Sequence, residues 1–203
     1  ALEAFGPQGL DVAGKVALDA GASTGGFTDV LLKRGAREVI AVDVGYGQLI
    51  WRLQNDPRVR VLDRTNIRNL TLEQIGQPAD LMVGDLSFIS LKLVLPAIAD
   101  CLAPGADLLP MVKPQFEVGK DRLGHGGVVR SNELRAEVTA DVAAYAQSLG
   151  LSVKGVTASG LPGPSGNVEY FLWLVKDGGA GALDAAALRA MVDTAVEEGP
   201  THT

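Results

Sequence analysis

Apolar residues gather in seven short runs along the chain, five of them before residue 114. These five runs are almost continuously apolar, which is typical of strands that are covered on both faces. Stretches with helical spacing separate them. The expected strands are residues 15–21, 38–44, 59–64, 80–86 and 106–113, and the expected helices are residues 26–34, 47–54, 71–75 and 90–101. Alternation of this kind predicts right-handed β-α-β units and a parallel sheet.

The second half of the chain does not continue this alternation of strands and helices. A polar, glycine-rich segment over residues 115–130 precedes a helix expected over residues 131–149, and another helix is expected over residues 184–198. Two strands, residues 151–159 and 169–176, are joined without room for a helix, which predicts an antiparallel pair. Pro110 cannot donate a ladder hydrogen bond, so we expect a bulge there or full pairing only beyond it.

Composition limits the class of protein. The 203 residues are 47% hydrophobic and 21% charged, as in ordinary soluble domains, and we expect one domain over residues 1–203. Cys101 has no partner for an internal disulfide, and no apolar run reaches the roughly 20 residues that cross a bilayer. These features favour a cytoplasmic protein without a membrane partner.

Small residues follow the first expected strand, where Gly21, Gly25 and Gly26 allow the backbone to approach a bulky ligand. A helix that begins near Gly26 offers unpaired N–H groups. Asp43 ends the second strand and is placed to accept hydrogen bonds from ribose hydroxyls. The sequence therefore predicts a cofactor that contains a nucleoside.

The charge of this loop favours one cofactor. Its glycine spacing departs from the G-x-G-x-x-G pattern of dinucleotide enzymes, and Asp19 would repel a pyrophosphate but suits the sulfonium and ammonium of S-adenosylmethionine. A dinucleotide-dependent oxidoreductase remains the alternative. We expect no metal, since His125 and His202 lack neighbouring ligands. The expected cofactor-binding residues are Asp19, Gly21, Ser23, Thr24, Gly25, Gly26, Phe27, Asp43, Val44, Asn66, Asp85 and Leu86.

Three ionisable residues mark the ends of later strands. Asp85 closes the fourth strand, Lys113 closes the fifth, and Glu169 opens the seventh. Because the seventh strand is expected to run antiparallel, its start lies at the same edge as the carboxyl ends of its parallel neighbours. We therefore expect the three side chains to meet beside the cofactor.

Five motifs carry a resemblance to a known family: LDAGASTGGFT (18–28), VDVGYGQL (42–49), DLSFISL (85–91), VKPQFEVG (112–119) and LPGPSGNVEYFLWL (161–174). The chain resembles the methyltransferase domain of the haemolysin-labelled TlyA family, which is similar to FtsJ-type RNA 2′-O-methyltransferases. The resemblance implies an α/β, Rossmann-like S-adenosylmethionine-dependent fold with a seven-stranded, mostly parallel sheet and an antiparallel last strand. It also implies an upstream S4-like RNA-binding domain, which the sequence in hand does not include.

The resemblance implies a catalytic Lys-Asp-Lys-Glu set, of which Asp85, Lys113 and Glu169 match the last three members. The first lysine is expected a few residues before Ala1, and neither Lys15 nor Lys33 lies where it could replace it. Neutral Lys113 would act as the base on a ribose 2′-hydroxyl while the carboxylates position it. We expect faster methylation from a version extended upstream.

The expected substrate is cytidine ribose in 16S and 23S ribosomal RNA, and the expected partners are ribosomal RNA or ribosomal subunits. The net charge of −6 opposes RNA binding by the whole surface. Residues 52–68 nevertheless hold five arginines against two aspartates, and residues 113–135 hold five basic against three acidic residues. A membrane-active haemolysin, suggested only by the family's label, is a further alternative, and the oligomeric state stays open.

Overall fold

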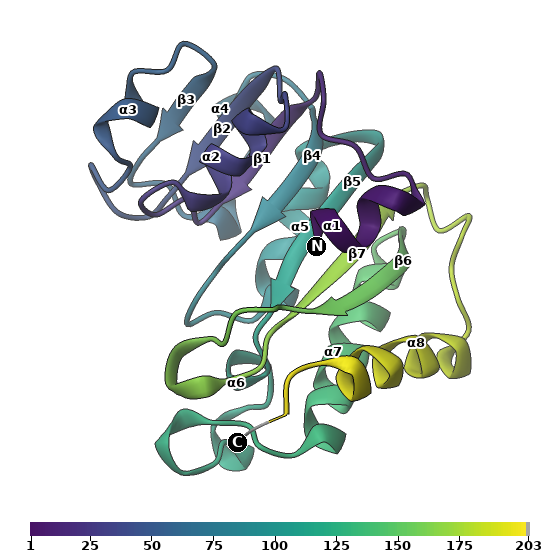
Figure 1. Cartoon of the computed structure of the whole chain (residues 1–203). Coiled ribbons are helices and arrows are strands. Elements are labelled where there is room, and N and C mark those ends of the chain that lie inside the picture. The colour runs from purple at the N-terminus through teal and green to yellow at the C-terminus, as the bar shows by residue number, and fades with distance from the viewer. Residues whose placement is uncertain (202–203) are drawn as a thin grey trace.

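Seven strands form one sheet in the order β3-β2-β1-β4-β5-β7-β6 in the computed structural model, which describes residues 1–201 (Figure 1). Strand β7 runs antiparallel to β5 and β6, and the other neighbouring pairs are parallel. The predicted fold class and the antiparallel pairing of the last two strands are confirmed. The strands are β1 (Val16–Ala20), β2 (Glu38–Val42), β3 (Val59–Leu62), β4 (Ala79–Gly84), β5 (Leu102–Val112), β6 (Leu151–Ala158) and β7 (Tyr170–Lys176).

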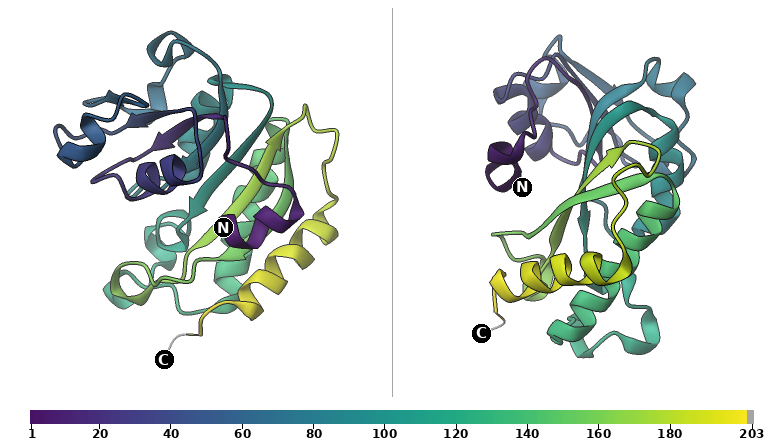
Figure 2. Two further views of the ribbon diagram at one scale, coloured as in Figure 1. Left: turned by 45° about the horizontal axis from the view of Figure 1, so that its top comes forward. Right: turned by 90° about the vertical axis from the view of Figure 1, so that its right-hand side faces the viewer.

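Helices cover both faces of the sheet, which explains why its strands are apolar on both sides. One face packs against α1 (Leu2–Phe5), α2 (Gly26–Lys33) and α3 (Trp51–Gln54). The other face packs against α4 (Leu72–Ile75), α5 (Leu91–Asp100), α7 (Asn132–Ser148) and α8 (Ala185–Glu198). Figure 2 shows α1 and α7 on opposite sides of the sheet.

Local sequence signals set several helix starts. Ser90 and Ser131 accept hydrogen bonds from the first turns of α5 and α7, and Thr71 forms a capping box with Gln74 at α4. The helix expected from residue 47 begins only at Trp51, because residues 43–50 form a loop around the second strand's end. None of the helices within residues 1–201 is long and apolar enough to cross a membrane.

Strand β5 differs from its expected form. It begins at Leu102, directly after α5, and its register against β4 shifts early, since β4 advances from Ala79 to Leu81 while β5 advances from Leu102 to Asp107. Pro110 pairs beside Gly84 of β4 but has no partner in β7. The bulge therefore lies earlier than Pro110, and the missing N–H is accommodated at a break in the β5–β7 ladder.

The polar segment after β5 folds into the short helix α6 (Pro114–Glu117) and two 3₁₀ turns, Lys120–Arg122 and His125–Gly127. Asn167 ties this segment to the join before β7, because its Oδ1 accepts from the Val129 N–H at 3.0 Å and its Nδ2 donates to the Gly127 carbonyl at 2.9 Å. His125 is exposed, and His202 lies outside the described residues.

Candidate active site

A cleft of about 460 Å³ opens at the carboxyl ends of β1, β2 and β4, beside the strand at which the sheet order reverses. Ligands of open α/β sheets bind at this position. Seven of the twelve predicted cofactor-binding residues line the cleft: Gly21, Ser23, Asp43, Val44, Asn66, Asp85 and Leu86. The lining also contains Val42, Gln48, Thr65, Ile67, Ser87, Phe88 and Ile89.

Gly21 lets the loop after β1 pass close to the end of β4. Its φ is +79°, and a Cβ there would lie 2.5 Å from the Asp85 carbonyl oxygen and 2.9 Å from a Leu86 methyl group. Gly25 (φ +108°) precedes α2, where a Cβ would lie 2.3 Å from Leu53. Gly21 is therefore required by the close approach of the β4 end, and Gly25 by its left-handed backbone conformation.

Asp43 is held with its carboxylate at the cleft. Its Oδ2 accepts a hydrogen bond from the Ser23 N–H and its Oδ1 accepts one from the Gly45 N–H, both at 2.8 Å. A carboxylate oxygen has more than one acceptor position. Asp43 can therefore still accept from a ribose hydroxyl, as the sequence predicts.

Asp19 lies under the cleft and not on its surface. It is fully buried, and the Thr28 hydroxyl of α2 donates to its Oδ2 at 2.7 Å. Burial raises the pKa of Asp19 to about 6, hydrogen bonds from Thr28 oppose this, and the nearby Asp85 and Asp43 add to it. Any influence of Asp19 on a ligand acts through its charge and not through direct contact.

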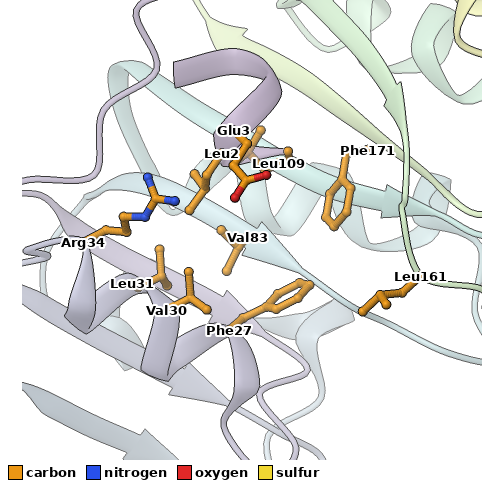
Figure 3. Close-up of a pocket in the computed structure, with 11 residues that line it drawn as sticks. Leu2, Glu3, Phe27, Val30, Leu31, Arg34, Val83, Leu109, Leu161 and Phe171 are labelled. Carbon is orange, nitrogen blue, oxygen red and sulfur yellow. The ribbon is translucent and has the colours of Figure 1, made fainter. Parts of the chain in front are cut away.

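The remaining predicted cofactor residues, Thr24, Gly25, Gly26 and Phe27, do not line the cleft. Phe27 instead turns into a second, largely apolar groove of about 480 Å³ that extends toward Ala1 and Leu2 (Figure 3). There its ring lies 6.1 Å from that of Phe171, centroid to centroid. This groove runs over the face of the sheet between α1, α2 and β7.

The lining of the cleft suits S-adenosylmethionine. It contains Asp43 and Asp85 but neither lysine nor arginine among the described residues. These two carboxylates would repel a pyrophosphate and would attract a positively charged sulfonium nucleoside. Val44, Ile67 and Leu86 add apolar surface that could pack against an adenosine, a combination of surfaces typical of cofactor sites.

Asp85 and Lys113 meet at the edge of the cleft. The Lys113 Nζ lies 2.5 Å from Asp85 Oδ1 and donates to Ser87 Oγ at 3.0 Å. Lys113 precedes Pro114 and has extended backbone angles, which aim its side chain along the strand end. Its side chain is only 7% exposed, whereas that of Asp85 is 43% exposed. The ammonium is thus held inside, with the carboxylate toward solvent.

Glu169 joins these two residues from the start of β7. It is buried, and burial raises the pKa of its carboxyl group, while the charge of Lys113 and a hydrogen bond from Gln115 oppose the rise and Asp85 adds to it. The fold therefore places Asp85, Lys113 and Glu169 within electrostatic reach of one another. Three charged groups at one sheet edge, with one of them shifted by burial, are typical of catalytic sites.

Sequence reasoning missed three residues of this site. Ser87 accepts from Lys113, Gln115 donates to Glu169 at 3.1 Å, and Gly163 lies against the Glu169 carboxylate. Their positions within the motifs DLSFISL, VKPQFEVG and LPGPSGN were the available signal.

Phe88, another residue of the cleft that the sequence analysis did not name, is 90% exposed with φ +63°, and its ring lies 5.0 Å from that of Phe116. An exposed ring in a strained backbone conformation at the cleft points to a ligand contact.

Comparisons with known proteins agree with this geometry. The model of the FtsJ-like methyltransferase family matches residues 1–176. The 16S/23S rRNA (cytidine-2′-O)-methyltransferase TlyA of Mycobacterium tuberculosis is 60% identical over 200 residues, which cover 98% of this chain and 73% of that protein. Hemolysin A of Brachyspira hyodysenteriae is 37% identical over 169 residues, covering 83% of this chain and 70% of that protein.

A solved structure of a candidate hemolysin from Streptococcus thermophilus matches with a TM-score of 0.89 and 38% sequence identity, covering 97% of this chain and 71% of that one. The family match covers most of the chain and favours a methyltransferase over the alternative of a dinucleotide-dependent oxidoreductase. The chain belongs to the FtsJ-like methyltransferase family, and its methyl donor is S-adenosylmethionine.

Proposed function

We propose that this chain methylates the 2′-hydroxyl of cytidine ribose in 16S and 23S ribosomal RNA, with Lys113 as the base and Asp85 and Glu169 as its positioning carboxylates. The observation that carries the proposal is the buried Lys113 ammonium, held 2.5 Å from Asp85 at the rim of the cleft. The name of the 60%-identical relative supports the choice of substrate.

The chemistry assigns a task to each side chain. A bound S-adenosylmethionine supplies an electrophilic methyl group on its sulfonium. The ribose oxygen would take up this methyl group as the carbon–sulfur bond breaks with its electron pair on sulfur. The hydroxyl proton would pass to Lys113 Nζ, which must first release its own ammonium proton to solvent. Asp85 and Ser87 hold the Nζ in place for this transfer. The proton then leaves to water through the exposed Asp85 side of the site.

The arginine-rich stretch supports an RNA substrate only in part. Arg52 and Arg58 are paired with aspartates, and Arg60 donates to backbone carbonyls. Arg64 lies over the Tyr46 ring, 4.4 Å from its centroid, and forms no ion pair with a described residue. Arg64 and Arg68 are therefore the arginines of this stretch that we assign to RNA phosphates.

The test compares Lys113→Met with the unchanged protein, using tritiated S-adenosylmethionine and purified ribosomal subunits. We expect loss of label in the RNA by about 100-fold or more, with adenosylhomocysteine binding retained. A matched control is Lys15→Met, since Lys15 pairs with Asp107 at 3.0 Å at the opposite edge of the sheet. Primer-extension mapping of ribose methylation on each rRNA identifies the nucleotide.

Full methylation by Lys113→Met would contradict the assignment of the base, and label on another nucleoside would contradict cytidine. The same protein preparation tests the membrane-active alternative. We expect no leakage from dye-loaded liposomes, and leakage that persists in Lys113→Met would support an activity separate from methyl transfer.

A further inference from the structure

Gln115 is the side-chain amide that contacts Glu169. It belongs to α6, two residues after Lys113, and its Nε2 donates to Glu169 Oε1 at 3.1 Å. Gln115 is 8% exposed and Glu169 is 6% exposed. A buried hydrogen bond to a charged acceptor is worth more than one between neutral groups. The same short segment thus carries both the lysine and the group that holds its carboxylate neighbour.

The amide has one favourable orientation. Gln115 Oε1 is buried and accepts no hydrogen bond from the described residues. If the amide were turned over, Oε1 would face the Glu169 carboxylate, and two acceptor oxygens would meet. The same oxygen that accepts from Gln115 also lies close to Gly163, where a Cβ would be 2.3 Å from Oε1. Glu169 Oε1 is therefore confined by the Gly163 backbone and by a donor that favours the charged form of the carboxyl group.

The charges around Glu169 explain why a donor is needed there. Lys113 at the end of β5 and Asp85 at the end of β4 act on it with opposite signs. The join over residues 161–167 carries no charged residue. Glu117 of α6 faces elsewhere, because it accepts from Ser90 Oγ at 2.6 Å and from the Leu91 N–H at 2.7 Å. Burial and Asp85 favour the neutral carboxyl group, so Lys113 and Gln115 together oppose protonation.

We propose that Gln115 is a positioning residue that holds Glu169 as a carboxylate directed toward Lys113. This inference rests on the proposed methyl transfer and adds to it the residue that sets the ionisation of its glutamate. It predicts a change in how the reaction depends on pH, which a residue that only stabilises the fold would not cause.

The experiment replaces Gln115 by methionine, which has a similar size but no N–H donor. Methylation of ribosomal subunits is measured in single turnovers from about pH 5.5 to about pH 9. Loss of the donor raises the pKa of Glu169, so the acid limb of the profile should move to higher pH by about one unit. At the lower end the variant should be about 10-fold slower than the unchanged protein, and near pH 9 the two rates should converge.

The matched control is Gln147→Met. Gln147 lies in α7, and its amide donates to the Leu183 carbonyl at 3.0 Å and accepts from the Leu183 N–H at 2.9 Å. This variant loses two comparable hydrogen bonds far from the cleft. We expect it to lower the free energy of unfolding without moving the acid limb.

Carbon-13 NMR of protein with labelled glutamate carboxyl groups gives a second readout that needs no RNA. The Glu169 resonance, identified by its loss in Glu169→Gln, should titrate at higher pH in Gln115→Met. If that variant does not fold, Gln115→Asn, whose shorter side chain cannot reach Glu169, takes its place. An unmoved titration would overturn the role of Gln115 alone, whereas full methylation by Glu169→Gln would overturn the proposed role of the glutamate.

Discussion

The buried Asp19 gives a prediction whose size follows from the structure. Its pKa of about 6, against 3.8 for an ordinary aspartate, means that the folded state binds a proton more tightly than the unfolded state. Above pH 6 the folded protein must hold a buried charge. Each pKa unit corresponds to about 1.4 kcal/mol, so the cost at pH 8 is about 3 kcal/mol, and it falls to about 1 kcal/mol at pH 4.5.

Asp19→Asn removes this charge. Its stability relative to the unchanged protein should therefore rise by about 2 kcal/mol between pH 4.5 and pH 8. The asparagine N–H₂ replaces an Oδ1 that has no partner among the described residues, which adds a constant penalty of about 1–3 kcal/mol. The change with pH, and not the absolute difference, is therefore the diagnostic quantity.

Urea unfolding at several pH values measures both proteins by the midpoint and slope of each transition. Asp177→Asn is the control with the opposite sign. Hydrogen bonds from Ser152 and from backbone N–H groups lower the pKa of Asp177, so its stabilisation is present at neutral pH and lost on acidification. A stability difference between Asp19→Asn and the unchanged protein that stays flat from pH 4.5 to pH 8 would refute the reasoning.

Two further predictions concern the site. Gly163→Ala would place a Cβ against the Glu169 carboxylate and should slow methylation by about 100-fold. Gly160→Ala is the control and should leave the rate unchanged, because Gly160 has open space around it. Equal rates for the two variants would show that the carboxylate can move. Phe88→Ala should weaken binding of ribosomal RNA by about 10-fold, the usual value of one stacked base, and should have little effect on the stability of the fold. Unchanged RNA binding in a filter assay would contradict a stacking role for Phe88.

The order of strands and helices could be predicted from the sequence because it depends on local periodicity. Apolar runs without alternation indicated strands covered on both faces, and the short join before residue 169 indicated the antiparallel β7. The same logic placed Asp85, Lys113 and Glu169 at one edge, since strand direction alone determines at which edge a terminal residue lies. The helices that follow Thr71, Ser90 and Ser131 begin within one residue of their expected starts, because capping is also a local interaction.

Only the tertiary structure determined how deeply each side chain is buried and which residues it contacts. Asp19 lies near the end of β1 and Asp43 directly follows β2, yet α2 covers the first and leaves the second at the cleft. Phe27 follows the cofactor loop but turns into the groove, because its position in the first turn of α2 directs its side chain away from the cleft. The contact between Gln115 and Glu169 joins segments that are distant in the chain. Periodicity determines which face a side chain takes, but what covers that face depends on packing between elements far apart in sequence.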